Sequence, residues 1–265
     1  MLFRSKLGIS SVIVEKNAGV NKHPKAHELN ARSIEILEEL DISTEELIKE
    51  ASPFSDGARI LFCQTIKEEY GRIDLFADEG LKEKYKRHLK SKTPYLNLSQ
   101  TELEKILLRK AKENPLIELL YQHEWQSLRQ DDTAVKSEIL DLKKETIFNI
   151  ESQYVLAADG AGSRCREFLE IPFIGPDKVN HFVSAYFENN LRDYVQTPAK
   201  LFWIFNPEAA GTLIAHHIEK RWVYMQPIYL DYEKKESFTK AYLENRIKKA
   251  LGNESLEIDV KSISY

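Results

Sequence analysis

The hydrophobic pattern predicts helices and strands in alternation over the first part of the chain. Leu2, Phe3 and Leu7 before Gly8 predict the end of a helix with a glycine C-cap, and residues 10–16 (SSVIVEK) predict a short β-branched strand. Apolar side chains recur at near-helical spacing in residues 27–40 and again in residues 100–112, where a capping box precedes them. This alternation is typical of an α/β fold.

A second series of strands follows in the middle of the chain. Residues 116–122 predict a strand, and three further apolar runs separated by Asp-Asp and Lys-Lys turns predict an antiparallel meander. The meander leads to a predicted strand at residues 154–158, followed by Asp159-Gly160 and a helix with Arg164. A strand that ends on a carboxylate and a glycine turn lies where open α/β folds bind cofactors. An ordinary strand-to-helix connection remains the alternative.

After Pro172 the pattern changes to strands with many aromatic residues, with a helix at 236–251 and a last strand at 257–264. A second, β-rich domain is therefore predicted here. The adjacent residues His216 and His217 point to opposite faces of a strand and lack a third ligand at suitable spacing, so no metal site is predicted. Five residues are candidates for lining a substrate cavity, with core packing as the alternative: Tyr186, Trp203, His216, Arg221 and Tyr224.

Composition narrows the function classes. A hydrophobic fraction of 42% with 12 Phe, 12 Tyr and 3 Trp can fill a core. The net charge of −4 comes from interspersed charges, and the lysine-rich residues 82–92 are predicted to be a solvated helix face or loop, so nucleic acid is not an expected partner. Two distant cysteines, no signal peptide and no apolar run of about 20 residues predict a cytoplasmic protein without a membrane partner.

Several polar residues lie where a nucleotide cofactor could be bound. Glu15 ends a strand, and an acid at the end of the second strand of a dinucleotide fold receives ribose hydroxyls. Lys25, Asn30 and Arg32 cluster at a helix start, where backbone N–H groups favour an anion. Gln100 lies in the first turn of the helix at 100–112. Surface polar residues without a ligand remain the alternative for each of them.

Three stretches in order, residues 12–40, 98–113 and 154–171, resemble the flavin-dependent aromatic hydroxylases, the class that includes p-hydroxybenzoate hydroxylase and phenol hydroxylase. The resemblance implies an α/β fold: an FAD-binding domain of the glutathione-reductase-like, Rossmann type with an inserted β-rich α+β substrate domain. Residues 1–53 and 99–171 would form the FAD-binding domain, and residues 54–98 and 172–265 the substrate domain.

The resemblance also implies residue roles. Glu15 would hold the adenosine ribose of FAD, and Lys25, in a PKA context where the family usually has PRA, would lie near the pyrophosphate. A lysine keeps the charge but loses the bidentate fork of arginine. Arg32 matches the family's arginine on the following helix, and Gln100 matches a glutamine that contacts the ribityl and phosphate region. Asp159 and Gly160 match the DG motif, which contacts FAD and is linked to NAD(P)H use.

The implied function is FAD-dependent monooxygenation of a phenolic or polyketide-like aromatic with NAD(P)H and O2. The expected partner is a small aromatic substrate, a homodimer is left open, and no catalytic acid or base is assigned. The family's N-terminal GxGxxG and C-terminal GD segment are absent, which predicts a product truncated at both ends. The alternatives are a non-catalytic remnant of the FAD-binding domain and a related flavin oxidoreductase with different chemistry, such as halogenation or desaturation.

Overall fold

The structure is a computed structural model that describes residues 2–75, 95–176, 180–229 and 231–265. The chain divides into two compact units. The first comprises Met1–Val20 and Ile106–Val179, and the second Asn21–Lys105 and Asn180–Tyr265. The units differ in their limits from the predicted domains, which remain a prediction because compactness does not assign function. The lysine-rich residues 82–92 lie outside the described residues.

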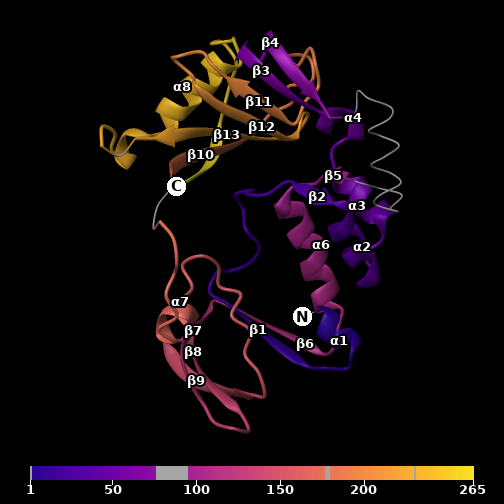
Figure 1. Ribbon diagram of the computed structural model, residues 1–265, viewed down its shortest axis with the longest axis vertical. Coiled ribbons are helices and arrows are strands. Elements are labelled where there is room, and N and C mark those ends of the chain that lie inside the picture. Colours follow the sequence, from indigo (N-terminus) through magenta and orange to yellow (C-terminus); the bar gives the residue numbers. More distant parts are fainter. Residues whose placement is uncertain (1, 76–94, 177–179, 230) are drawn as a thin grey trace. The chain divides into compact units, whose positions relative to one another are not determined.

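The first unit contains a parallel pair of strands and the predicted antiparallel meander (Figure 1). The first helix ends before Gly8, whose φ of 75° confirms the predicted glycine cap. Cys63 in the second unit and Cys165 in the first are both free. The elements of the first unit are α1 (Leu2–Lys6), β1 (Ser11–Glu15), β6 (Ile117–Tyr121), β7 (His123–Gln130), β8 (Val135–Asp141), β9 (Thr146–Ser152) and α7 (Arg164–Phe168).

The strand predicted at residues 154–158 is wrong. These residues follow β9 without regular secondary structure, and Tyr154 and Leu156 are 80% and 58% exposed. A strand needs a neighbouring backbone to pair with, and within the described ranges no strand pairs with this segment. The apolar run therefore has strand propensity, but no neighbouring strand in the described ranges offers it backbone hydrogen bonds.

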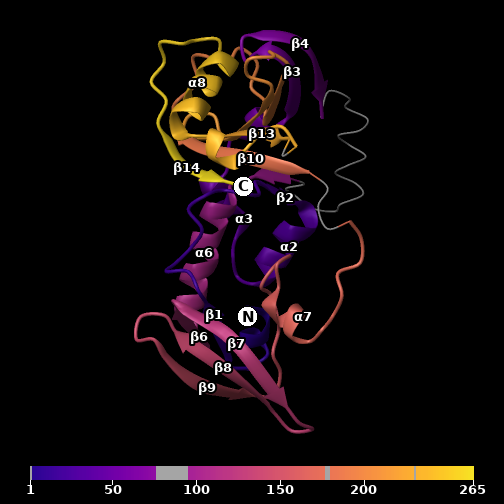
Figure 2. The same cartoon turned by 90° about the vertical axis from the view of Figure 1, so that its left-hand side faces the viewer.

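The second unit is built on a seven-stranded sheet with the order β14-β10-β13-β12-β11-β3-β4. All neighbouring strands are antiparallel except β11 and β3, which are parallel. Helix α8 covers one face of this sheet (Figures 1 and 2). The strands are β3 (Arg59–Thr65), β4 (Glu68–Asp74), β10 (His181–Glu188), β11 (Leu201–Ile204), β12 (Gly211–His217), β13 (Arg221–Ile228) and β14 (Val260–Ser264).

The two faces of the sheet differ in chemistry. Val183, Ala185 and Phe187 of β10 point into the core beneath α8 (Lys240–Ala250). Side chains alternate along a strand, so Ser184 and Tyr186 lie on the opposite face, which we call the polar face. Tyr224, a candidate for a substrate cavity with core packing as the alternative, is a fully buried member of the core, and its hydroxyl donates to the Ala209 and Ala210 carbonyls.

Shorter elements complete the second unit, and two helices begin later than predicted. Helix α2 starts after Asn30, whose side chain accepts from the Ser33 N–H, and α8 starts after Thr239, which caps it in the same way. Residues 28–30, which the sequence predicts to lie in the helix at 27–40, form strand β2 instead. The elements are β2 (Glu28–Asn30), α2 (Ala31–Glu39), α3 (Thr44–Glu50), α4 (Phe54–Gly57), β5 (Tyr95–Asn97) and a 3₁₀ turn (Lys235–Ser237).

The helix predicted at residues 100–112 is confirmed as α6 (Gln100–Lys112), whose sequence runs through the limit between the two units. Its apolar side chains at i, i+3 and i+4 made it the strongest local signal in the sequence. None of the helices in the described ranges is long and apolar enough to span a bilayer.

Candidate functional site

In the first unit, Glu15 occupies the carboxyl end of β1, which pairs in parallel with β6. Its Oε1 accepts hydrogen bonds from the backbone N–H and the side-chain amide of Asn17, at 2.7 Å and 2.6 Å. These two bonds fix the carboxylate at the strand end, and both go to the same oxygen. Oε2 can therefore accept hydrogen bonds from ribose hydroxyls, as expected of an acid in this position.

Asp159 and Gly160 lie just before the turn that leads into α7, whose N-cap is Ser163. The Asp159 carboxylate accepts from the Ser163 hydroxyl at 2.6 Å and from the Cys165 N–H at 3.1 Å. The Ser163 hydroxyl bond is the main cause that lowers the pKa of Asp159. Gly160 has a φ of 81°, a left-handed conformation that favours glycine, and no atom lies near the position of an added Cβ. Both carboxylate oxygens are thus already used to organise the turn.

Replacing Asp159 by Ala should reduce stability by about 1 kcal/mol at pH 7, as for the loss of a helix N-cap. Because the folded-state pKa is lowered, the ionised carboxylate contributes stability above its unfolded pKa of about 4, and this contribution is lost as the pH falls through the lowered value. Urea unfolding of wild type and variant between pH 7 and pH 2 checks this. A difference that does not narrow toward low pH contradicts it.

In the second unit, Lys25 is exposed on a segment without regular secondary structure that is tied to the start of α6. The Gln100 side-chain oxygen accepts from the Ala26 N–H at 3.2 Å, and the Gln100 N–H donates to the Ala26 carbonyl at 2.8 Å. The Gln100 amide nitrogen donates to Glu104 at 2.6 Å. The predicted residues Lys25 and Gln100 are therefore brought together through Ala26.

Arg32 lies on the first turn of α2 in the second unit. Its guanidinium pairs with Glu35 at 3.2 Å, and its side chain is 66% exposed. Exposed pairs of this kind contribute at most about 1 kcal/mol. An anionic group of a ligand could thus replace Glu35 at little energetic cost.

Two histidines that the sequence analysis did not single out anchor the segment around Lys25. The ring of His23 lies 2.8 Å from the Ser262 hydroxyl through Nδ1 and 2.9 Å from the Ser184 hydroxyl through Nε2. The ring of His27 bonds the Asn97 side-chain oxygen at 2.8 Å through Nδ1. Two histidines four residues apart within a run of turn-forming residues were the available signal, but their partners are far away in the sequence.

His27 also lies against His216, with the ring centroids 4.8 Å apart. Burial lowers the pKa of both rings, that of His216 well below its ordinary value. His216 is 2% exposed, and its Nδ1 has no hydrogen-bond partner among the described residues. The two neutral rings lie at the polar face, which also carries Tyr186 and Arg221, two further candidates for a substrate cavity. Within the described ranges, no group of three His, Cys, Asp or Glu side chains could hold a metal ion.

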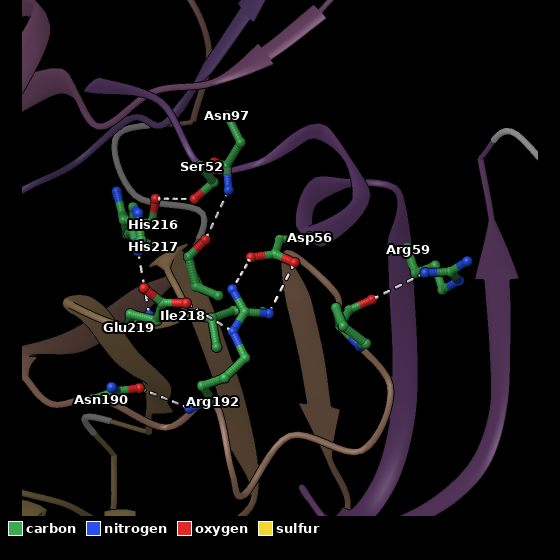
Figure 3. A network of polar contacts seen from close by, with 12 residues as sticks. Ser52, Asp56, Arg59, Asn97, Asn190, Arg192, His216, His217, Ile218 and Glu219 are labelled. Carbon is green, nitrogen blue, oxygen red and sulfur yellow. Dashed lines mark hydrogen bonds and ion pairs between the residues drawn. The ribbon is translucent and has the colours of Figure 1, made fainter. Parts of the chain in front are cut away.

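A network of polar contacts joins α4 to the loops of the sheet (Figure 3). Arg192 makes two bonds to the buried Asp56 carboxylate, at 3.0 Å and 2.5 Å, and a third to Glu219 at 3.0 Å. Beside it, Ser52 donates to the His216 carbonyl and Asn97 donates to the Ala215 carbonyl. The same Asn97 thus supports His27 and the end of β12.

The predicted cofactor residues form a donor set that fits FAD chemically. A carboxylate at a strand end suits hydroxyls, exposed cations suit a diphosphate, and an amide can donate or accept. Glu15, Asp159 and Gly160 belong to the first unit, whereas Lys25, Arg32 and Gln100 belong to the second.

Comparison with known proteins gives a consistent assignment. The family model described as FAD binding domain matches residues 2–265. The chain is 26% identical over 208 residues to 2,4-dichlorophenol 6-monooxygenase of Delftia acidovorans, covering 78% of this chain and 35% of that protein. It is 27% identical over 265 residues to a Streptomyces halstedii protein named as a polyketide hydroxylase, covering 98% and 46%.

Among solved structures, the chain resembles the flavin-dependent monooxygenase PieE in complex with FAD and substrate. The TM-score is 0.89 at 25% identity, over 99% of this chain and 46% of that one. This likeness confirms the predicted α/β fold class, with a Rossmann-type FAD-binding domain and a β-rich domain. The chain spans less than half the length of each of these three proteins.

Proposed function

Because the chain belongs to the FAD-binding domain family, we propose that it supplies FAD binding and substrate contacts for the hydroxylation of a phenolic or polyketide-like aromatic with NAD(P)H and O2. The observation that carries this proposal is the family match over residues 2–265. The names of its relatives, a chlorophenol monooxygenase and a polyketide hydroxylase, support the substrate class.

The proposed residue roles follow from the contacts of each side chain. Glu15 accepts hydrogen bonds from the adenosine ribose through Oε2, while Asn17 holds Oε1. Lys25 and Arg32 offset the charge of the pyrophosphate. Gln100 exchanges one of its present hydrogen bonds for one to the cofactor. Asp159 keeps the turn at Gly160 in shape, so that backbone N–H groups can approach the cofactor closely.

The polar face of the seven-stranded sheet is the proposed surface for the aromatic substrate. It carries the four candidate cavity residues that lie outside the core cluster beneath α8: Trp203, which is 46% exposed, Arg221, which is partly exposed, and Tyr186 and His216, which are buried. We propose residues 1–53 and 99–171 as the FAD-binding part and residues 54–98 and 172–265 as the substrate part. FAD, when bound, supplies the redox and oxygen chemistry, and the protein binds, orients and excludes water.

A direct test is to purify the chain, add FAD, remove the unbound cofactor and record the visible spectrum. The expected result is a flavin spectrum and aerobic oxidation of NADPH or NADH that a phenol or a polyketide aromatic accelerates. A colourless protein that oxidises neither would contradict the proposed function for this chain.

Lys25 should contribute to FAD affinity through charge. Changing Lys25→Ala removes one exposed ammonium–phosphate contact of about 1 kcal/mol, or roughly fivefold in the dissociation constant, and Lys25→Arg should retain affinity. Quenching of FAD fluorescence measures both. Lys49→Ala, at another exposed lysine of the second unit, is the matched control. Equal changes of the FAD dissociation constant in Lys25→Ala and Lys49→Ala would show that Lys25 does not belong to the FAD site.

A further inference from the structure

The segment that carries Lys25 has no regular secondary structure, so only its contacts can fix it. The Asn21 N–H donates to Glu104 at 2.9 Å, and the Asn21 side-chain oxygen accepts from the His23 N–H at 3.2 Å. Ala26 is bonded to Gln100 through both its N–H and its carbonyl. These contacts hold the two ends of the segment to α6.

His23 holds the middle of the same segment to the sheet. It is 8% exposed, and both ring nitrogens are within hydrogen-bond distance of serine hydroxyls. Ser184 is on β10 and Ser262 is on β14, which are adjacent strands of the sheet. The ring therefore spans two strands, and its removal would leave two hydroxyls without this partner.

The chemistry of the ring suits this position. Burial, and secondarily the nearby Lys25 ammonium, lower the pKa of His23, so the ring is neutral at pH 7. A neutral imidazole donates from one nitrogen and accepts at the other, and a serine hydroxyl can take either role. The pair of serines accordingly satisfies the ring in either tautomer.

We propose that His23 is a positioning residue that fixes the Lys25 segment on the polar face through Ser184 and Ser262, so that the lysine is held ready for the FAD pyrophosphate. This inference deepens the proposed function and rests on the role proposed there for Lys25. It goes further in making two serines of the substrate-binding sheet part of the support for cofactor binding. Ordering a loop before binding removes that cost from the binding free energy.

The test compares three variants of the full chain: His23→Ala, the double variant Ser184→Ala with Ser262→Ala, and all three changes together. Hydrogen exchange of the amides of residues 21–26 reports on the segment itself. Quenching of FAD fluorescence reports on affinity, and His181→Ala is a matched histidine control at the start of β10.

We expect faster exchange of these amides and roughly fivefold weaker FAD binding in His23→Ala. The serine double variant should give the same loss, and the triple variant no further loss, because the three residues act through one contact. His181→Ala should leave both measurements unchanged. Additive losses, or unchanged exchange in His23→Ala, would overturn the proposal.

The two hypotheses fail separately. A wild-type chain that does not quench FAD fluorescence overturns the proposed function. The hydrogen-exchange measurement then tests by itself whether His23 fixes the Lys25 segment. Should His23→Ala fail to fold, the serine double variant carries the test, because it leaves the histidine ring in place and removes only its partners.

Discussion

Replacing Arg192 by Met is expected to lower the free energy of unfolding by about 3 kcal/mol or more, as for other buried ion pairs that lose one partner. Asp56 is 3% exposed, and Arg192 meets both of its carboxylate oxygens. The ion pair raises the pKa of Arg192, with the Asp56 contact as the largest cause. Met keeps most of the aliphatic stem, so the loss reports chiefly on the carboxylate left buried without its cation.

Urea unfolding followed by circular dichroism measures this loss, and Arg72→Met supplies the matched control. Arg72 also makes two bonds to one carboxylate, that of Glu69, but its side chain is 47% exposed. An exposed pair should be worth less than about 1 kcal/mol. Similar losses in the two variants would show that burial of Asp56 does not determine the strength of the Arg192 contact.

Local patterns predicted local structure well. The helix at Gln100–Lys112 and the meander of β7, β8 and β9 were predicted because their periodicity and turn residues lie within a short stretch of sequence. Helix α2 does not begin at the predicted residue 27, because residues 28–30 pair with β5 as a strand and Asn30 then caps the helix.

Features that depend on distant partners could not be predicted in the same way. The apolar residues 154–158 have strand propensity, but pairing needs a neighbour that their own sequence does not identify. Arg192 and Asp56 are separated by 136 positions, and His23 and Ser262 by 239. Only the folding of the chain as a whole brings such residues together.

In the candidate site, too, some features could be predicted from the sequence and others depend on distant partners. The resemblance identified Glu15, Lys25 and Gln100 by residue type and order. It could not predict that Gln100 forms hydrogen bonds with both the N–H and the carbonyl of Ala26. Nor could it predict that His23 holds the Lys25 segment to two strands of the sheet. Those contacts convert an exposed lysine in an irregular segment into one with a defined position. The supporting residues are therefore the part of the site that required the structure.

The largest loss of stability is expected for Trp222→Ala, at about 3–5 kcal/mol, because the deletion of a large buried side chain leaves a cavity. Trp222 is 0% exposed, its ring lies against Phe187 and Phe202, and its indole N–H donates to the Ile218 carbonyl at 2.9 Å. The core beneath α8 would lose contacts on several strands at once, so the remaining side chains can close the cavity only partly.

Trp203→Ala is the matched control, since it removes the same side chain from β11, where Trp203 is 46% exposed. A loss of about 1 kcal/mol or less is expected there, because an exposed ring leaves no cavity. Urea unfolding followed by far-ultraviolet circular dichroism measures both variants. If Trp203→Ala were as costly as Trp222→Ala, the polar face would be packed as a second core. Trp203 could not then contact a substrate, and the proposed substrate surface would have to be abandoned.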